Sequence, residues 1–220
     1  MHNVSTAMNQ VLQACPMLGH FLRPQDVQAI EPVHMPVGEA LTEIITTQML
    51  SDSDAAKIIH CLRRKAGSGK IWRLPEQDLF TCGVSRSKAR TIHLMGKHYD
   101  ADIRGFESWR SEPADVVREE LKLLWGLGDW TADRLLLNYF GHLDIWPQHD
   151  LSINHGLEKL HRLCLQQGLG WCFDPDRARP YRSYLTRILW DIDQKQLRQL
   201  RPVQGVYSNP PASHHDALNV

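Results

Sequence analysis

The sequence lacks an excess of charge of either sign, because 25 basic and 25 acidic residues give it a formal net charge of zero. It also lacks an apolar run long enough to span a membrane. Its first ten residues, MHNVSTAMNQ, have neither the basic region nor the apolar region of a secretion signal. We therefore expect no membrane association, and a location in the cytoplasm, or in the nucleus if the source is a eukaryote.

Cysteine is scarce and irregularly spaced. The five cysteines form no regular pattern, so they do not suggest a disulfide framework, and free thiols fit a reducing compartment. The chain carries no P-loop, dinucleotide fingerprint, zinc-protease helix or nucleophile elbow. We expect no metal site, and the common nucleotide-binding and hydrolase classes receive no support.

Strand patterns are nearly absent, whereas helical patterns recur along the chain. There is no long alternation of apolar and polar residues and no Asn-Gly or Asp-Gly hairpin signal. Apolar residues recur at helical spacing over 40–50, and again after a capping box at 51–54. The predicted fold class is all-α. Residues 202–220 are poor in apolar residues and are predicted to be a disordered tail.

A glycine-containing turn between two apolar segments is the most informative feature. The sequence LWGLGDWTADRLLLN at 124–138 places Gly126 and Gly128 between two helical runs. Glycine at both positions lets the backbone adopt positive φ and approach another molecule closely. The second helix begins near Trp130, so its free N–H groups and positive dipole end face whatever the turn approaches. This arrangement predicts a grip on a phosphate backbone that reads no bases.

Basic residues gather between Arg63 and Lys97, where Glu76 and Asp78 are the only acids. The segment would suit a stripe that faces nucleic acid, but a solvated helix face explains it equally well. Zero net charge counts mildly against a nucleic-acid binder. The turn at 124–138 therefore supports nucleic-acid binding more strongly than charge does.

Together with this turn, four further segments in order make the chain similar to the helix-hairpin-helix DNA glycosylases over roughly residues 12–193. LTEIITTQMLS at 41–51 resembles the helix end that carries the family's wedge, and GVSRSKARTIHLM at 83–95 resembles the next helix. WPQHDLSIN at 146–154 resembles the catalytic-aspartate segment, and RPYRSYLTRILW at 179–190 resembles the closing helix. The closest likeness is to the branch that removes alkylated bases, typified by 3-methyladenine.

The resemblance implies two helical lobes with the active-site cleft between them. One lobe would comprise residues 38–145 with the helix-hairpin-helix motif. The other would be discontinuous and would join residues 1–37 to 146–201. The implied activity is base excision repair: the enzyme binds double-stranded damaged DNA, flips a base out of the stack and hydrolyses its N-glycosidic bond. We expect a monomer that associates with the nucleoid in the cytoplasm, or a nuclear enzyme in a eukaryote.

Asp150 is the predicted catalytic residue. Glycosidic cleavage develops positive charge at the anomeric carbon of the sugar. A carboxylate stabilises that charge electrostatically or helps to activate a water. Local sequence alone favours a simpler interpretation, in which Asp150 only caps the helix that follows. The matched segment and its spacing from the glycine turn favour catalysis.

The resemblance also implies a base pocket. Trp130 and Tyr181 match aromatic residues of this pocket in the alkylbase branch, where an electron-rich face attracts a cationic base. Trp146 would join the pocket or anchor its loop. Arg134 departs from the aromatic residue of some relatives and would oppose a cationic base. Lyase-competent relatives carry a lysine where this chain has Trp130, so we expect a monofunctional enzyme without abasic-site lyase activity.

The matched segments imply the DNA contacts as well. Met49 resembles the wedge that fills the vacated stack, with Gln48 beside the orphaned base, although a buried methionine would be the commoner use. Gly126, Gly128 and Thr131 would grip the phosphate, and turn carbonyls could hold a monovalent cation. Arg182 and Ser183 are predicted to contact DNA or to orient the Asp150 loop. Surface and capping roles explain this last pair almost as well.

No cofactor is expected. The oxidised-pyrimidine and mismatch-adenine branch carries a C-terminal four-cysteine loop, and only Cys164 and Cys172 fall near that position, with Cys61 and Cys82 far away. Two thiolates are too few for an iron–sulfur cluster. The sequence thus predicts a glycosylase for alkylated purines (3-methyladenine and 7-methylguanine). The alternatives are a glycosylase for uracil, hypoxanthine or an ethenoadduct, and a helix-hairpin-helix module that only binds DNA.

Overall fold

Helices form the regular structure of the computed structural model, which describes residues 3–194. No strand occurs within that range, so the all-α prediction is confirmed. No helix there is long and apolar enough to cross a membrane. Residues 195–201 and the predicted tail 202–220 lie outside the described residues. The α-helices are α1 (Val4–Ala14), α2 (Val37–Thr47), α3 (Asp52–Ala66), α4 (Glu76–Thr81), α5 (Arg86–Ala101), α6 (Ile103–Ser108), α7 (Ala114–Lys122), α8 (Asp129–Asn138), α9 (Leu151–Gln166) and α10 (Arg182–Gln194). Short 3₁₀ helices are η1 (Pro16–His20), η2 (Pro24–Asp26), η3 (Ile71–Arg73), η4 (Trp109–Ser111) and η5 (Pro175–Ala178).

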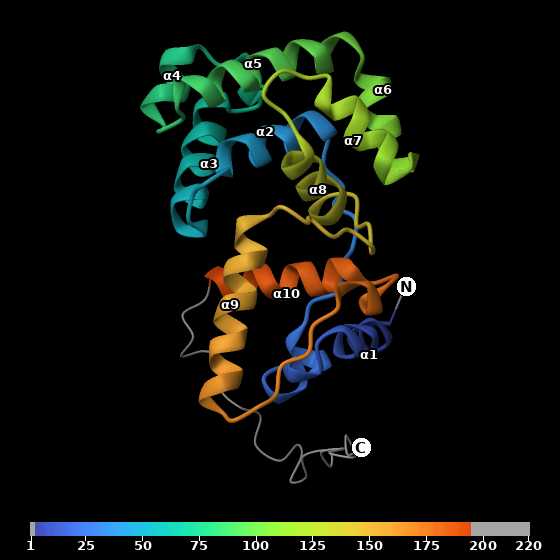
Figure 1. Ribbon diagram of the computed structural model, residues 1–220. Coiled ribbons are helices and arrows are strands. Elements are labelled where there is room, and N and C mark those ends of the chain that lie inside the picture. Colours follow the sequence, from blue (N-terminus) through green and yellow to red (C-terminus); the bar gives the residue numbers. More distant parts are fainter. Residues whose placement is uncertain (1–2, 195–220) are drawn as a thin grey trace, which may run out of the picture.

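The helices fall into two groups (Figure 1). Helices α2 to α8 lie together in the upper part of the view, and α1, α9 and α10 lie together below them. Helix α1 packs against both α10 and η5, so the N-terminal segment joins the C-terminal one. The discontinuous second lobe and the boundaries at 37/38 and 145/146 stay predictions.

Capping residues set the helix ends that frame the site. The hydroxyl of Ser51 accepts a hydrogen bond from the backbone N–H of Asp54, which begins α3 at the expected capping box. Ser85 caps α5 in the same way. Helix α2 begins after Pro36, a few residues before the apolar periodicity indicated, and Gly67 ends α3 with a positive φ.

Helices α9 and α10 cross closely at Gly156. A β-carbon at Gly156 would come within 2.3 Å of the carbonyl oxygen of Leu189, so only glycine fits at this crossing. The close approach brings Trp190 of α10 beside the beginning of α9, where Asp150 lies. The crossing therefore positions the predicted catalytic residue.

The expectation of free thiols throughout is wrong in one respect. Cys61 of α3 and Cys82 at the end of α4 form a disulfide, with their Cα atoms 5.6 Å apart. Helices α3 and α4 pack against each other and bring together two cysteines that are 21 residues apart in the sequence. Cys15, Cys164 and Cys172 are free. Spacing alone does not reveal such a pair, because it depends on how two helices dock.

Candidate active site

The turn between α7 and α8 is built as a hairpin with one conformationally demanding glycine. Gly126 has φ +79°, and a β-carbon there would lie 2.6 Å from the Thr91 hydroxyl of α5. Gly128 is extended, with φ −151°, so the expectation of positive φ at both glycines is wrong. Helix α8 begins without a side-chain cap. Thr131 is buried, which leaves its backbone rather than its hydroxyl for a phosphate.

Asp150 caps α9 and is almost fully buried, with 6% of its surface exposed. Its Oδ1 accepts a hydrogen bond from the backbone N–H of Ser152 at 2.8 Å. Its Oδ2 accepts one from the indole Nε1–H of Trp190 at 3.2 Å. The carboxylate is thus fixed in orientation by two donors. The capping interpretation is confirmed. Because the same carboxylate also lines two cavities, its catalytic role stays a prediction.

Two cavities meet at Trp130 and Asp150. The first cavity, of about 340 Å³, is also lined by Met49 and Arg134. The second cavity, of about 370 Å³, is also lined by Trp146. Trp130 is half-buried and borders both spaces, so it is more than a core residue. A flat molecule on the indole of Trp130 would therefore lie beside the Asp150 carboxylate.

Arg134 lies within the aromatic wall of the first cavity. Its guanidinium carbon is 3.6 Å from the ring centroid of Trp190 and 5.2 Å from that of Trp130. Arginine keeps its positive charge at every ordinary pH. The lining of the first cavity thus includes a cation beside Trp130.

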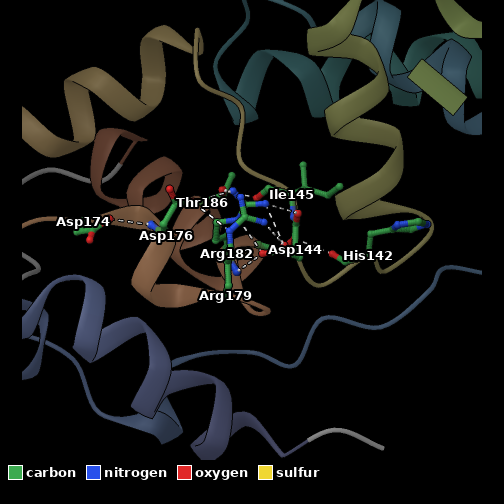
Figure 2. Close-up of polar contacts among 9 residues, drawn as sticks. His142, Asp144, Ile145, Asp174, Asp176, Arg179, Arg182 and Thr186 are labelled. Atoms are coloured by element: carbon green, nitrogen blue, oxygen red, sulfur yellow. Dashed lines mark hydrogen bonds and ion pairs between the residues drawn. The ribbon is translucent and has the colours of Figure 1, made fainter. Parts of the chain in front are cut away.

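Polar contacts from the start of α10 hold the loop that leads to Asp150 (Figure 2). Arg182 forms a two-pronged ion pair with Asp144, at 2.7 and 2.9 Å. Burial raises the pKa of the Asp144 carboxyl, but hydrogen bonds from Arg182 and its charge outweigh burial, so this pKa is lowered. Buried Ser183 accepts from the N–H of Ile145 and donates to the carbonyl of His142. These contacts fit the loop-orienting role. The expectation that Ser183 contacts DNA is wrong, because its side chain is buried.

Met49 protrudes from the chain between α2 and α3. Its side chain is 89% exposed, and its backbone has φ +60°, which is uncommon for a residue other than glycine. The buried-methionine alternative is therefore wrong. Gln48 ends α2, and its carbonyl accepts a hydrogen bond from the ammonium group of Lys88. Met49 also lines the first cavity, as a wedge beside a base pocket would.

Comparisons with known proteins show which proteins this chain is similar to. No family model matches the chain. The alkylbase DNA glycosidase-like protein mag2 of Schizosaccharomyces pombe is 24% identical over 172 residues, which cover 73% of this chain and 79% of that protein. DNA-3-methyladenine glycosylase 1 of the same yeast is 27% identical over 157 residues, or 67% of this chain and 65% of that protein. The sequence of this chain is thus similar to those of proteins named for alkylbase and 3-methyladenine DNA glycosylase activity.

The similarity extends to the fold. The structure of the Schizosaccharomyces pombe 3-methyladenine DNA glycosylase in complex with abasic DNA has a TM-score of 0.64 and 20% identity, covering 84% of this chain and 90% of that one. The DNA-3-methyladenine glycosidase of Bacillus halodurans has a TM-score of 0.62 and 21% identity, covering 89% and 95%. A probable transcriptional activator and DNA repair enzyme of Mycobacterium tuberculosis is 28% identical, and the match covers only 27% of its length.

In the structure, only some of the predicted pocket residues line a cavity. Tyr181 is not among the residues that line either cavity; its ring lies 6.5 Å from that of Tyr184 in an edge-on contact. Trp146 borders the second cavity and packs near Phe173. Sequence reasoning missed Trp190, which touches both Arg134 and Asp150. Its place in a segment that resembles the closing helix was the one available signal.

Proposed function

We propose that this protein is a monofunctional DNA glycosylase of base excision repair. It hydrolyses the N-glycosidic bond of alkylated purines in duplex DNA, with 3-methyladenine and 7-methylguanine as the first substrates to test. The observation that carries the proposal is the buried, doubly hydrogen-bonded Asp150 carboxylate at the junction of two cavities. The homologues are named for the same activity.

The proposed reaction needs only water and the bound DNA. The hairpin holds the strand by its phosphate, and Met49 fills the space that the flipped base leaves. As the base departs with the electrons of the glycosidic bond, the Asp150 carboxylate stabilises the positive charge on the sugar. A water oxygen then bonds to the anomeric carbon and gives up a proton, which leaves a free base and an abasic site. A monovalent cation at the hairpin carbonyls stays a prediction.

The proposal includes the absence of lyase chemistry. A lyase needs an amine that forms a Schiff base with the sugar. No lysine is among the described residues that line the two cavities, and the hairpin position holds Trp130. We expect no borohydride-trapped adduct with DNA and no strand nicking at abasic sites. A trapped adduct would overturn this part of the proposal alone.

Two other functions are weaker. Arg134 favours a glycosylase for another damaged base, such as uracil, hypoxanthine or an ethenoadduct, because its charge opposes cationic substrates. A module that only binds DNA needs no buried carboxylate beside the bound strand, and Asp150 therefore argues against it. Turnover separates the two classes, since a binding module protects DNA stoichiometrically and releases no base. The protein is proposed to act as a monomer.

The test is to incubate the protein with methylated genomic DNA and to identify the freed bases by chromatography. We expect the wild type to release methylated purines and Asp150→Asn to be slower by about 10²–10³-fold. Asparagine caps a helix about as well as aspartate does. An Asp150→Asn variant with wild-type turnover would therefore mean that Asp150 only caps α9.

Two controls keep this comparison clean. Asparagine offers one acceptor oxygen where Asp150 serves two donors, so one donor loses its partner at a cost of about 1–3 kcal/mol. Trp190→Phe removes one of the donors, and adding it to Asp150→Asn should recover part of the lost stability without recovering activity. Glu158→Gln changes an exposed carboxylate elsewhere on α9 and should leave base release unchanged. If no protein released a base while all bound DNA, the binding-only module would be favoured.

A further inference from the structure

The first cavity contains one permanent cation and one carboxylate. Among the described residues that line it, Arg134 is the only lysine or arginine and Asp150 is the only acid. The other lining groups are apolar, aromatic or neutral polar side chains, with His149 as the remaining titratable base. A base in this cavity therefore meets a nearly balanced pair of charges rather than a negative pocket.

The position of Arg134 determines what can stack on the aromatic wall. Its guanidinium carbon lies 5.2 Å from the ring centroid of Trp130, the indole that lines the cavity. It lies 3.6 Å from that of Trp190, which is buried and is not among the lining residues. A cation over an aromatic face occupies the same negative face that a cationic base would use. A second cation at this wall would also be repelled, and the repulsion is stronger in a partly buried site than in water. A cationic purine thus loses the attraction that an uncharged aromatic wall would provide.

A neutral purine is not repelled by the charge of Arg134. Its ring can stack on indole or guanidinium without a charge penalty, since the planar guanidinium stacks on aromatic faces. The guanidinium N–H groups are donors, so they form hydrogen bonds only with acceptor atoms of the base. Methylation at N3 or N7 of a purine removes a ring lone pair and places a positive charge on the ring, whereas a neutral adduct keeps acceptor nitrogens.

We propose that Arg134 is a specificity-determining residue that shifts the preference of this enzyme away from cationic N3- and N7-methylated purines and toward neutral alkylated purines, such as the etheno adduct of adenine. The proposal rests on the proposed function, and it narrows the substrate class of the same site. Arg134 does not replace Asp150, because the carboxylate stabilises the sugar whichever base leaves.

The test compares single-turnover base release from two duplexes of identical sequence. One contains a 1,N6-ethenoadenine and the other a 7-methylguanine. The measured quantity is the rate of ethenoadenine release divided by the rate of 7-methylguanine release. This ratio should be lower in Arg134→Gln than in the wild type by on the order of tenfold to a hundredfold, because the variant lacks the positive charge that repels the cationic base in a partly buried site. Arg134→Lys keeps the charge and should retain most of the discrimination.

A matched control removes the same charge elsewhere. Arg104→Gln lies on α6 at an exposed position outside the cavity lining and should leave the ratio unchanged. Thermal unfolding of each variant shows that it is folded, and Arg134→Met provides a second neutral replacement. An unchanged ratio in folded Arg134→Gln and Arg134→Met would overturn the inference while the proposed function stood. Release of no base by the wild type from either duplex or from methylated genomic DNA would overturn both.

Discussion

Lys88 should control the wedge, although it lies on a different helix. Its ammonium group donates hydrogen bonds to the backbone carbonyls of Thr46 and Gln48, at 2.9 and 2.5 Å. These carbonyls lie at the end of α2, immediately before Met49. A cation at a helix C-terminus is also favoured by the helix dipole. We predict that Lys88→Met releases the end of α2 and weakens binding to duplex DNA that contains a lesion.

The contacts of Met49 and Lys88 set the size of the expected loss in duplex binding. Met49 adopts φ +60°, a left-handed conformation that costs a residue with a β-carbon about 1–2 kcal/mol. Hydrogen bonds to a charged group contribute about 1.5–3 kcal/mol each, but water would replace Lys88 at these carbonyls in the variant. A net loss of about 1–3 kcal/mol corresponds to a roughly 5- to 150-fold increase in Kd.

The assay measures Kd for a lesion-containing duplex and for the same lesion strand alone. A wedge acts only where a stack must be filled, so Lys88→Met should weaken duplex binding far more than single-strand binding. Met49→Ala should show the same selectivity. Arg104→Met removes an exposed charge from α6 and should leave the ratio of the two constants as in the wild type. Equal losses on duplex and single strand would refute the reasoning, because they would make Lys88 a general phosphate contact.

Two further predictions concern the hairpin. Arg118 donates from both Nε and Nη2 to buried Asp133, so Arg118→Met should destabilise the fold by about 3–5 kcal/mol at neutral pH, measured by denaturant unfolding. Burial raises the pKa of Asp133 even with Arg118 present, and loss of the arginine raises this pKa further. The loss of stability in Arg118→Met should therefore be full at neutral pH and shrink as the pH falls through the pKa of Asp133. A stability loss that grew on acidification would contradict this account. Gly126→Ala should lower the unfolding temperature, because Gly126 has a positive φ and lies close to Thr91. Gly128 is extended and has nothing within 4 Å of the position that a β-carbon would take, so Gly128→Ala should leave the unfolding temperature unchanged but weaken DNA binding. Equal unfolding temperatures of the two variants would contradict the prediction.

The helices and their ends were accessible from sequence because they depend on local chemistry. Ser51 and Ser85 cap helices where serine precedes a helical pattern, and Gly67 ends one. Apolar spacing predicts which face of each helix is buried. The Cys61–Cys82 disulfide was not accessible, because it depends on the docking of two separate helices.

The site was only partly predictable for a similar reason. Asp150 and Trp130 belong to segments with a recognisable pattern, and both border the same cavities. Tyr181 matches a pocket position by sequence but lies outside both cavities, since the start of α10 turns its ring toward Tyr184. Trp190 lies in the segment that resembles the closing helix, but the sequence assigns it no role. Its contact with Asp150 comes from the tight crossing of α9 and α10.

The active site depends on both helix groups at once. Trp130 is contributed by the hairpin helix α8, whereas the Asp150 carboxylate is oriented by Trp190 of α10. The segment between them, from 139 to 150, must therefore keep its length and path for the two to meet. The ion pair of Asp144 with Arg182 fixes that path at its midpoint. A change in this connection would separate the proposed base-stacking surface from the carboxylate without altering either one. The proposed activity therefore depends on this connection as much as on the residues that it joins.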